Sequence, residues 1–144
     1  MANILYAEDD RSCRELFAFS LRQKQHRVHE AINGAQAVQI VREEPIDVAI
    51  LDVRMPMMTG YDAACRISEE APHVPIVFLS AKGLRREVTM GFDCGSAVVD
   101  YLIKPITPQR LVDRIEDILE NCRIRGMEAV REENMTRELA VIEW

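Results

Sequence analysis

Five short runs of apolar and β-branched residues alternate along the chain with segments of helical periodicity. The runs cover residues 3–7, 27–31, 46–51, 76–79 and 98–103, and each predicts a strand. The intervening segments carry apolar residues at helical spacing, namely Cys13, Leu16, Phe17 and Leu21, then Ala37, Val38 and Val41, then Ala64, Cys65 and Ile67. The pattern therefore predicts a strand followed by a helix, repeated five times.

Helix start signals and the composition of the strands define the fold class. Thr59 lies three residues before Asp62, as in a capping box, and Thr107 precedes Pro108, as an N-cap precedes a first-turn proline. The run at 46–51 is almost continuously apolar, which is typical of parallel strands covered by helices on both faces. We therefore expect an α/β fold with a doubly wound, five-stranded parallel sheet.

Length and charge limit the remaining possibilities. A chain of 144 residues that is 48% hydrophobic suits one domain with a proper core. No apolar run approaches the ~20 residues of a membrane span, so we expect a soluble cytoplasmic protein without membrane contact. The net charge of -6 disfavours direct binding to nucleic acid, because such surfaces need clustered cations.

Chemically reactive residues follow the predicted strands where each strand ends. Glu8, Asp9 and Asp10 follow the first strand, and Asp52 follows the third. Ser80 and Lys104 stand at the ends of the fourth and fifth strands. Ligands of open parallel sheets bind at the carboxyl ends of the strands, so these side chains should meet at one site.

The residue types at this rim indicate metal-assisted phosphoryl chemistry. Adjacent carboxylates repel one another, and a cation removes the conflict. Carboxylate oxygens suit Mg²⁺, which completes its shell with water and phosphate oxygens. Beside such an ion, Asp52 could act as a nucleophile that forms an aspartyl phosphate, while a lysine and a hydroxyl neutralise the phosphoryl oxygens.

Four motifs give the chain a family resemblance over roughly residues 3–120. They are Glu8-Asp9, the stretch Leu51-Asp52-Val53-Arg54-Met55-Pro56 with Gly60 beyond it, Leu79-Ser80-Ala81, and Asp100-Tyr101-Leu102-Ile103-Lys104-Pro105. In this order, each at the end of its own strand, they resemble the receiver domains of bacterial two-component response regulators. The resemblance implies a flavodoxin-like (βα)5 receiver fold.

The resemblance also implies a role for each site residue. Asp52 would accept a phosphoryl group from the phosphohistidine of a sensor histidine kinase or a phosphotransfer protein. Glu8, Asp9, Asp52 and the backbone carbonyl of Arg54 would hold Mg²⁺. Ser80 and Lys104 would contact the phosphoryl group, and Tyr101 would be a switch that turns inward when Ser80 moves. The Lys104-Pro105 peptide bond is a candidate for the cis form.

In functional terms, the resemblance implies a phosphoacceptor signalling domain rather than an enzyme with an external substrate. It would catalyse only its own phosphorylation and dephosphorylation, and its change of conformation would control a downstream output domain or protein. A homodimer is a further possibility. The alternative is a degenerate receiver that binds a partner without being phosphorylated.

Three further features of the sequence lead to specific expectations. The turn before the fifth strand, residues 95–101, is about two residues longer than the family pattern. Arg54 and Lys82 should stand at the mouth of the site and slow hydrolysis of the phosphoryl group, unless both point to solvent. We divide the chain into a receiver domain at 1–121 and a C-terminal helical extension at 122–144, which is either a linker helix or a frayed or packed tail.

Overall fold

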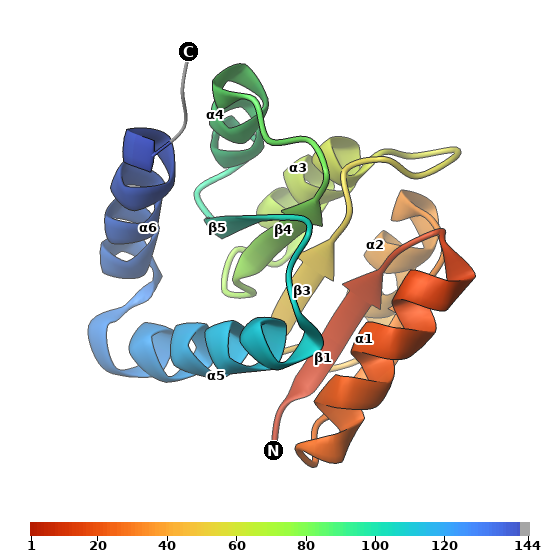
Figure 1. Cartoon of the computed structure of the whole chain (residues 1–144). Helices are drawn as coiled ribbons and strands as arrows, with labels where there is room; N and C mark the ends of the chain where they lie inside the picture. Colours follow the sequence, from red (N-terminus) through yellow and green to blue (C-terminus); the bar gives the residue numbers. More distant parts are fainter. Residues whose placement is uncertain (142–144) are drawn as a thin grey trace.

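The computed structural model describes residues 1–141 and contains one five-stranded parallel sheet of order β2-β1-β3-β4-β5 (Figure 1). Its strands are β1 Asn3–Ala7, β2 Arg27–Ala31, β3 Val48–Leu51, β4 Ile76–Ser80 and β5 Val98–Ile103. The helices are α1 Arg11–Gln23, α2 Gly34–Glu43, α3 Gly60–Glu70, α4 Arg85–Asp93, α5 Pro108–Arg125 and α6 Met127–Val141. This is the doubly wound, flavodoxin-like architecture that the sequence predicts.

Helices cover both faces of the sheet, and alternate residues of each strand enter separate cores. In β1, Leu5 packs with residues of α2, α3 and α4, whereas Tyr6 packs with residues of α1 and α5. Because the helices on both sides bury apolar strands, all of β3 and all of β1 after Asn3 are buried. No helix among residues 1–141 is long and apolar enough to cross a membrane.

Two residues assigned to buried helix faces are in fact exposed. Leu16 is 52% exposed because α1 faces the sheet with Phe17, Ala18 and Leu21. Cys65 is also exposed, since α3 turns Ala64 and Ile67 inward instead. The third strand begins at Val48 rather than at 46, and the fourth continues to Ser80.

One residue of β5 lies outside the regular pairing with β4. Ile76 pairs with Val98, but the next residue, Val77, pairs with Asp100. Val99 is therefore an additional residue in β5, and the ladder contains a β-bulge at this position.

The C-terminal extension is helical, as expected, and it packs against the domain. Helix α5 continues to Arg125, and α6 follows directly and lies along β5 beside α4 (Figure 1). Asn134 of α6 is 5% exposed, and its side-chain amide donates to the carbonyl of Val99, 3.0 Å away. Residues 142–144, the last part of the predicted extension, lie outside the described residues.

Candidate functional site

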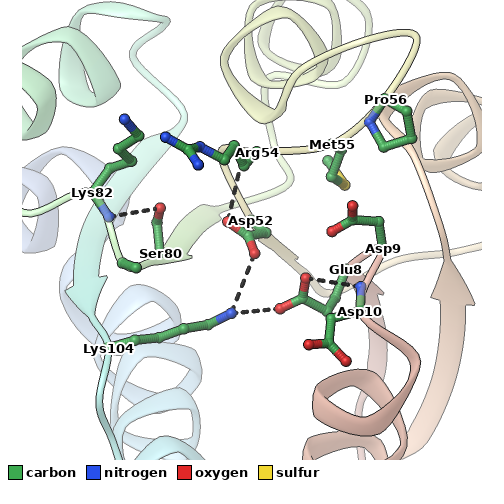
Figure 2. Close-up of a pocket in the computed structure, with 11 residues that line it drawn as sticks. Glu8, Asp9, Asp10, Asp52, Arg54, Met55, Pro56, Ser80, Lys82 and Lys104 are labelled. Atoms are coloured by element: carbon green, nitrogen blue, oxygen red, sulfur yellow. Dashed lines mark hydrogen bonds and ion pairs between the residues drawn. The ribbon is translucent and has the colours of Figure 1, made fainter.

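The carboxyl ends of β1, β3, β4 and β5 surround a cavity of about 710 Å³ (Figure 2). The sequence-predicted residues Glu8, Asp9, Asp52, Arg54, Ser80 and Lys104 all line it. The strand order reverses between β1 and β3, which is where doubly wound sheets bind their ligands. The fold thus brings these residues together across 96 positions of the chain, from Glu8 to Lys104.

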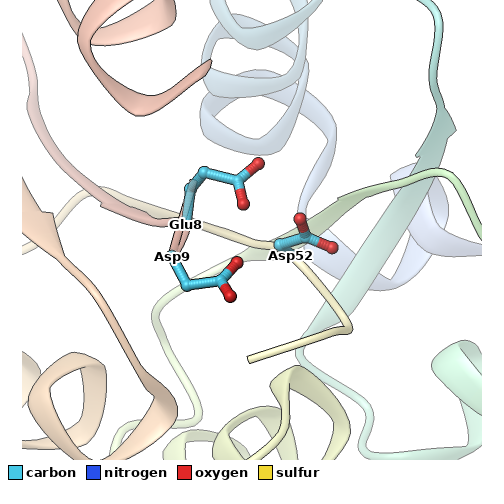
Figure 3. A group of neighbouring side chains, drawn as sticks. All are labelled: Glu8, Asp9 and Asp52. Carbon is cyan, nitrogen blue, oxygen red and sulfur yellow. The ribbon is translucent and has the colours of Figure 1, made fainter. Parts of the chain in front are cut away.

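Three carboxylates converge at this end of the sheet (Figure 3). Glu8, Asp9 and Asp52 each offer an oxygen, and these oxygens lie within 4.8 Å of one another. Glu8 is 2% and Asp52 7% exposed, whereas Asp9 is exposed. Burial raises the pKa of Glu8, and repulsion from Asp52 adds to this rise. The cluster therefore carries an unfavourable concentration of negative charge.

Lys104 supplies part of the missing positive charge. Its Nζ donates to Glu8 Oε1 at 2.5 Å and to Asp52 Oδ2 at 3.2 Å (Figure 2). Burial by itself would lower the pKa of this ammonium, but the contacts with Glu8 and Asp52 outweigh burial and raise the pKa. The peptide bond that follows, Lys104-Pro105, is cis, as expected.

Backbone contacts fix the position of Asp52. Its amide donates to the carbonyl of Ala7, and its Oδ1 accepts from the amide of Arg54 at 3.3 Å. The first residue of α3, Gly60, approaches so closely that an added Cβ would lie 2.0 Å from the Asp52 carbonyl oxygen. Glycine is therefore required here for α3 to begin directly beneath the Asp52 turn.

Two long cations stand beside Asp52 and Ser80. Arg54 and Lys82 both line the cavity (Figure 2). The hydroxyl of Ser80 accepts from the amide of Lys82 at 3.1 Å. The ammonium of Lys82 lies 3.6 Å from Glu87 Oε2. Glu87 is not among the residues predicted from the sequence, because Leu84 at the start of α4 gives no capping signal to mark Glu87 as its partner.

Tyr101 lies outside the cavity but is connected to it. The ring is completely buried, 5.5 Å from the ring of Phe78 between centroids. Its hydroxyl donates to the carbonyl of Lys82, the residue whose amide contacts Ser80. Burial is the main cause of the raised pKa of this phenol. The structure therefore places the predicted switch residue in an inward position.

Comparison with known proteins gives consistent results. The family model described as the response regulator receiver domain matches residues 4–116. The response regulator GtcR of Aneurinibacillus migulanus is 34% identical over 78% of this chain and 46% of its own length. The transcriptional regulatory protein SrrA of Staphylococcus aureus is 30% identical over 87% of this chain and 51% of its own length. The chain thus spans about half the length of these curated relatives.

A solved structure shows the same likeness in three dimensions. A putative response regulator from Chloroflexus aurantiacus is 32% identical, with a TM-score of 0.75 over 83% of this chain and 98% of its own. The residues matched by the family model end at 116, before α6 begins at Met127. Helix α6 is therefore an addition to the matched domain.

Proposed function

Because the chain belongs to the response regulator receiver domain family, we propose that it signals by accepting a phosphoryl group on Asp52. The observation that carries this proposal is the meeting of Asp52 with two further carboxylates, a lysine and a hydroxyl at one cavity. Family membership establishes a signalling domain. The assignment of the acceptor and of its helpers is our inference from the geometry.

The acidic cluster fits a magnesium ion. Three carboxylates within 4.8 Å offer hard oxygen ligands, and the pKa of Glu8 is raised by burial first and by the neighbouring Asp52 second, despite the contact with Lys104. Glu8, Asp9 and Asp52 would hold the ion, with the backbone carbonyl of Arg54 as a further ligand. A bound Mg²⁺ would supply charge stabilisation to the phosphoryl oxygens during transfer.

The chemical step is a displacement at phosphorus. A carboxylate oxygen of Asp52 attacks the phosphorus of a phosphohistidine, so a P–O bond forms as the P–N bond breaks. The electron pair of the broken bond stays on the histidine nitrogen, which then takes up a proton. Hydrolysis ends the signal: water attacks the phosphorus, the P–O bond to Asp52 breaks, and the products are the free carboxylate and inorganic phosphate. The domain thus promotes its own phosphorylation and dephosphorylation.

Ser80 and Lys104 stabilise the transferred group from two sides. The Ser80 hydroxyl, 1% exposed at the end of β4, can donate to a phosphoryl oxygen. Lys104 already lies 3.2 Å from Asp52 Oδ2, so its ammonium can pair with the group that Asp52 receives. This complete set supports a phosphoacceptor rather than a receiver that only binds a partner.

The partners follow from this chemistry. The donor would be a sensor histidine kinase or a phosphotransfer protein, and the recipient a downstream output domain or protein. The chain could also form a homodimer, and the partner in the output would then be a second copy of it. The matched segments cover only about half of the relatives named above, so those proteins contain further segments that could serve as output.

Incubation with acetyl phosphate and Mg²⁺ tests the proposal directly. Intact-mass spectrometry should show the addition of one phosphoryl group, and peptide mapping should locate it at Asp52. Asp52→Asn should abolish uptake. Asp10→Asn is the matched control, because Asp10 lines the same cavity but caps α1, a role that asparagine also performs.

Two outcomes would contradict the assignment. Uptake by Asp52→Asn at the wild-type rate would show that another residue is the acceptor. A wild-type protein that gains no phosphoryl group would instead support the partner-binding alternative. The role of the acidic pair is tested separately, since Asp9→Asn should raise the Mg²⁺ concentration needed for half-maximal uptake.

A further inference from the structure

Helix α6 is attached to the edge of the sheet by polar side chains. The guanidinium of Arg131 donates to the carbonyls of Gly95 and Val98, at 2.9 and 2.7 Å. Asn134 donates to the carbonyl of Val99 in the bulge. These carbonyls belong to β5 and the turn before it, and β5 is the last strand of the sheet. The first half of α6 therefore supplies hydrogen-bond donors to these edge carbonyls, which a neighbouring strand or water would otherwise supply.

The second half of α6 reaches the helix that follows the phosphoacceptor site. Arg85, the first residue of α4, donates to the carbonyl of Leu139. Met135 and Leu139 pack against the core cluster that contains Tyr101. Arg137 lies 3.6 Å from the buried carboxylate of Asp100, the residue before Tyr101. α4 and α6 thus contact each other, and both contact β5, the strand that carries Tyr101 (Figure 1).

The surroundings leave Tyr101 no exposed surface. On the side of α4, Gly91 lies so close that an added Cβ would be 2.7 Å from the ring. Met135 and Leu139 of α6 pack against the same core cluster as the ring, and α6 contacts both β5 and α4. Close packing of this kind excludes a second position unless its neighbours move.

We propose that α6 is a positioning element for Tyr101: it fills the edge of β5 beside α4 and holds the ring inward. This inference rests on the proposed function, because the hydroxyl of Tyr101 contacts Lys82, whose amide contacts Ser80 in the phosphoacceptor site. An inward ring keeps the Lys82 turn in the arrangement shown in Figure 2. Docking of α6 and loading of Asp52 therefore favour each other, and thermodynamic linkage makes this coupling reciprocal.

The test uses the double variant Met135→Ala/Leu139→Ala of the full chain. Both side chains are only partly buried, so the fold should survive their truncation. The matched control is Leu16→Ala/Ile124→Ala, which truncates two apolar side chains that are 52% and 64% exposed on other helices. The volume-conserving pair Met135→Leu/Leu139→Met should behave as the wild type.

Fluorine NMR reports ring position and site loading in one spectrum. The chain has three tyrosines, so 3-fluorotyrosine gives three signals, and Tyr101→Phe identifies the relevant one. Beryllofluoride with Mg²⁺ is the probe that mimics the phosphoryl group, and its bound form has its own fluorine signal. A merely structural role of α6 would alter melting temperature but not the environment of the Tyr101 ring.

The expected result has two parts. In the wild type and both controls, the Tyr101 signal should hardly change on loading. In Met135→Ala/Leu139→Ala it should shift before loading and return on loading, with half-loading at about fivefold higher beryllofluoride. An unshifted signal with unchanged loading would overturn the positioning role. If no variant, including the wild type, shows bound beryllofluoride, the proposed function fails and the coupling with it.

Discussion

Replacing Lys104 with methionine tests how the acidic cluster is stabilised when no metal is bound. The methionine keeps an unbranched apolar chain but removes the ammonium that lies 2.5 Å from Glu8 and 3.2 Å from Asp52. Both carboxylates are nearly buried and would then face each other without this cation. We expect the variant to be destabilised in chelator and largely restored by Mg²⁺.

The expected loss of stability in Lys104→Met follows from how deeply its ion pairs are buried. Removing one partner of a buried ion pair costs about 3–5 kcal/mol. The side chain of Lys104 is 21% exposed, so solvent screens part of the interaction and we take the lower end, about 3 kcal/mol. For a chain of this size, that loss lowers the melting temperature by about 6–12 °C. Saturating Mg²⁺ should reduce the difference to less than half, because the proposed ion would neutralise the same oxygens.

Thermal melts followed by circular dichroism measure the difference in melting temperature between Lys104→Met and the wild type, once in EDTA and once in Mg²⁺. Lys24→Met, at an exposed lysine at the end of α1, is the control and should melt like the wild type in either buffer. A Lys104→Met variant that melts like the wild type in EDTA would refute the reasoning. So would a difference from the wild type that grows when Mg²⁺ is added.

The remaining predictions concern phosphoryl lifetime, pH and packing. Arg54→Asn with Lys82→Glu should shorten the phosphoryl half-life about tenfold, equivalent to about 1.4 kcal/mol of barrier, because we expect both cations to shield the phosphoryl group from water attack. A dephosphorylation time course measures this, and an equal or longer half-life would contradict it. Burial and the nearby Asp100 raise the pKa of Glu138 from 4.5 to about 7, so the folded protein binds this proton more strongly than the unfolded chain. The free energy of unfolding should therefore fall as pH rises from about 5 to 7. Urea titrations at several pH values measure this dependence, and Glu138→Gln should weaken it. A pH dependence that is unaltered in Glu138→Gln would exclude Glu138 as its cause. Gly60→Ala should lower the free energy of unfolding by about 1–3 kcal/mol and slow phosphorylation, because the Cβ of alanine would meet the Asp52 carbonyl oxygen and push α3 away. A variant with normal stability and a normal phosphorylation rate would show that α3 can shift freely.

The sequence predicted the sheet and the location of the site because both depend on local patterns. Apolar runs define strands, and a parallel sheet places all their carboxyl ends on one rim. The order of strands then brings Glu8, Asp52 and Lys104 together without further information. The placement of these residues at one cavity agrees with that expectation, and their roles remain predictions.

The packing of α6 could not be inferred in the same way. Its attachment depends on Arg131 and Asn134, polar residues whose partners are backbone carbonyls about 35 residues away in the sequence. Hydrophobic periodicity does not register such contacts, so the sequence predicts a helical extension but leaves open whether it is a linker helix or a packed tail. The exposure of Leu16 was missed for a related reason, since spacing alone does not say which edge of an apolar face meets the sheet.

The closed edge of β5 has a consequence for self-association. An open edge strand is a template on which other chains can add strands, and this is a common route to aggregation. Here the bulge and the side chains of α6 block that route at β5. At the opposite edge, Arg22 donates to the carbonyl of Val28 in β2, at 2.8 Å. Displacing α6 would therefore expose a template for strand addition. Variants with a loosened α6 should aggregate more readily than the wild type, through contacts made by β5.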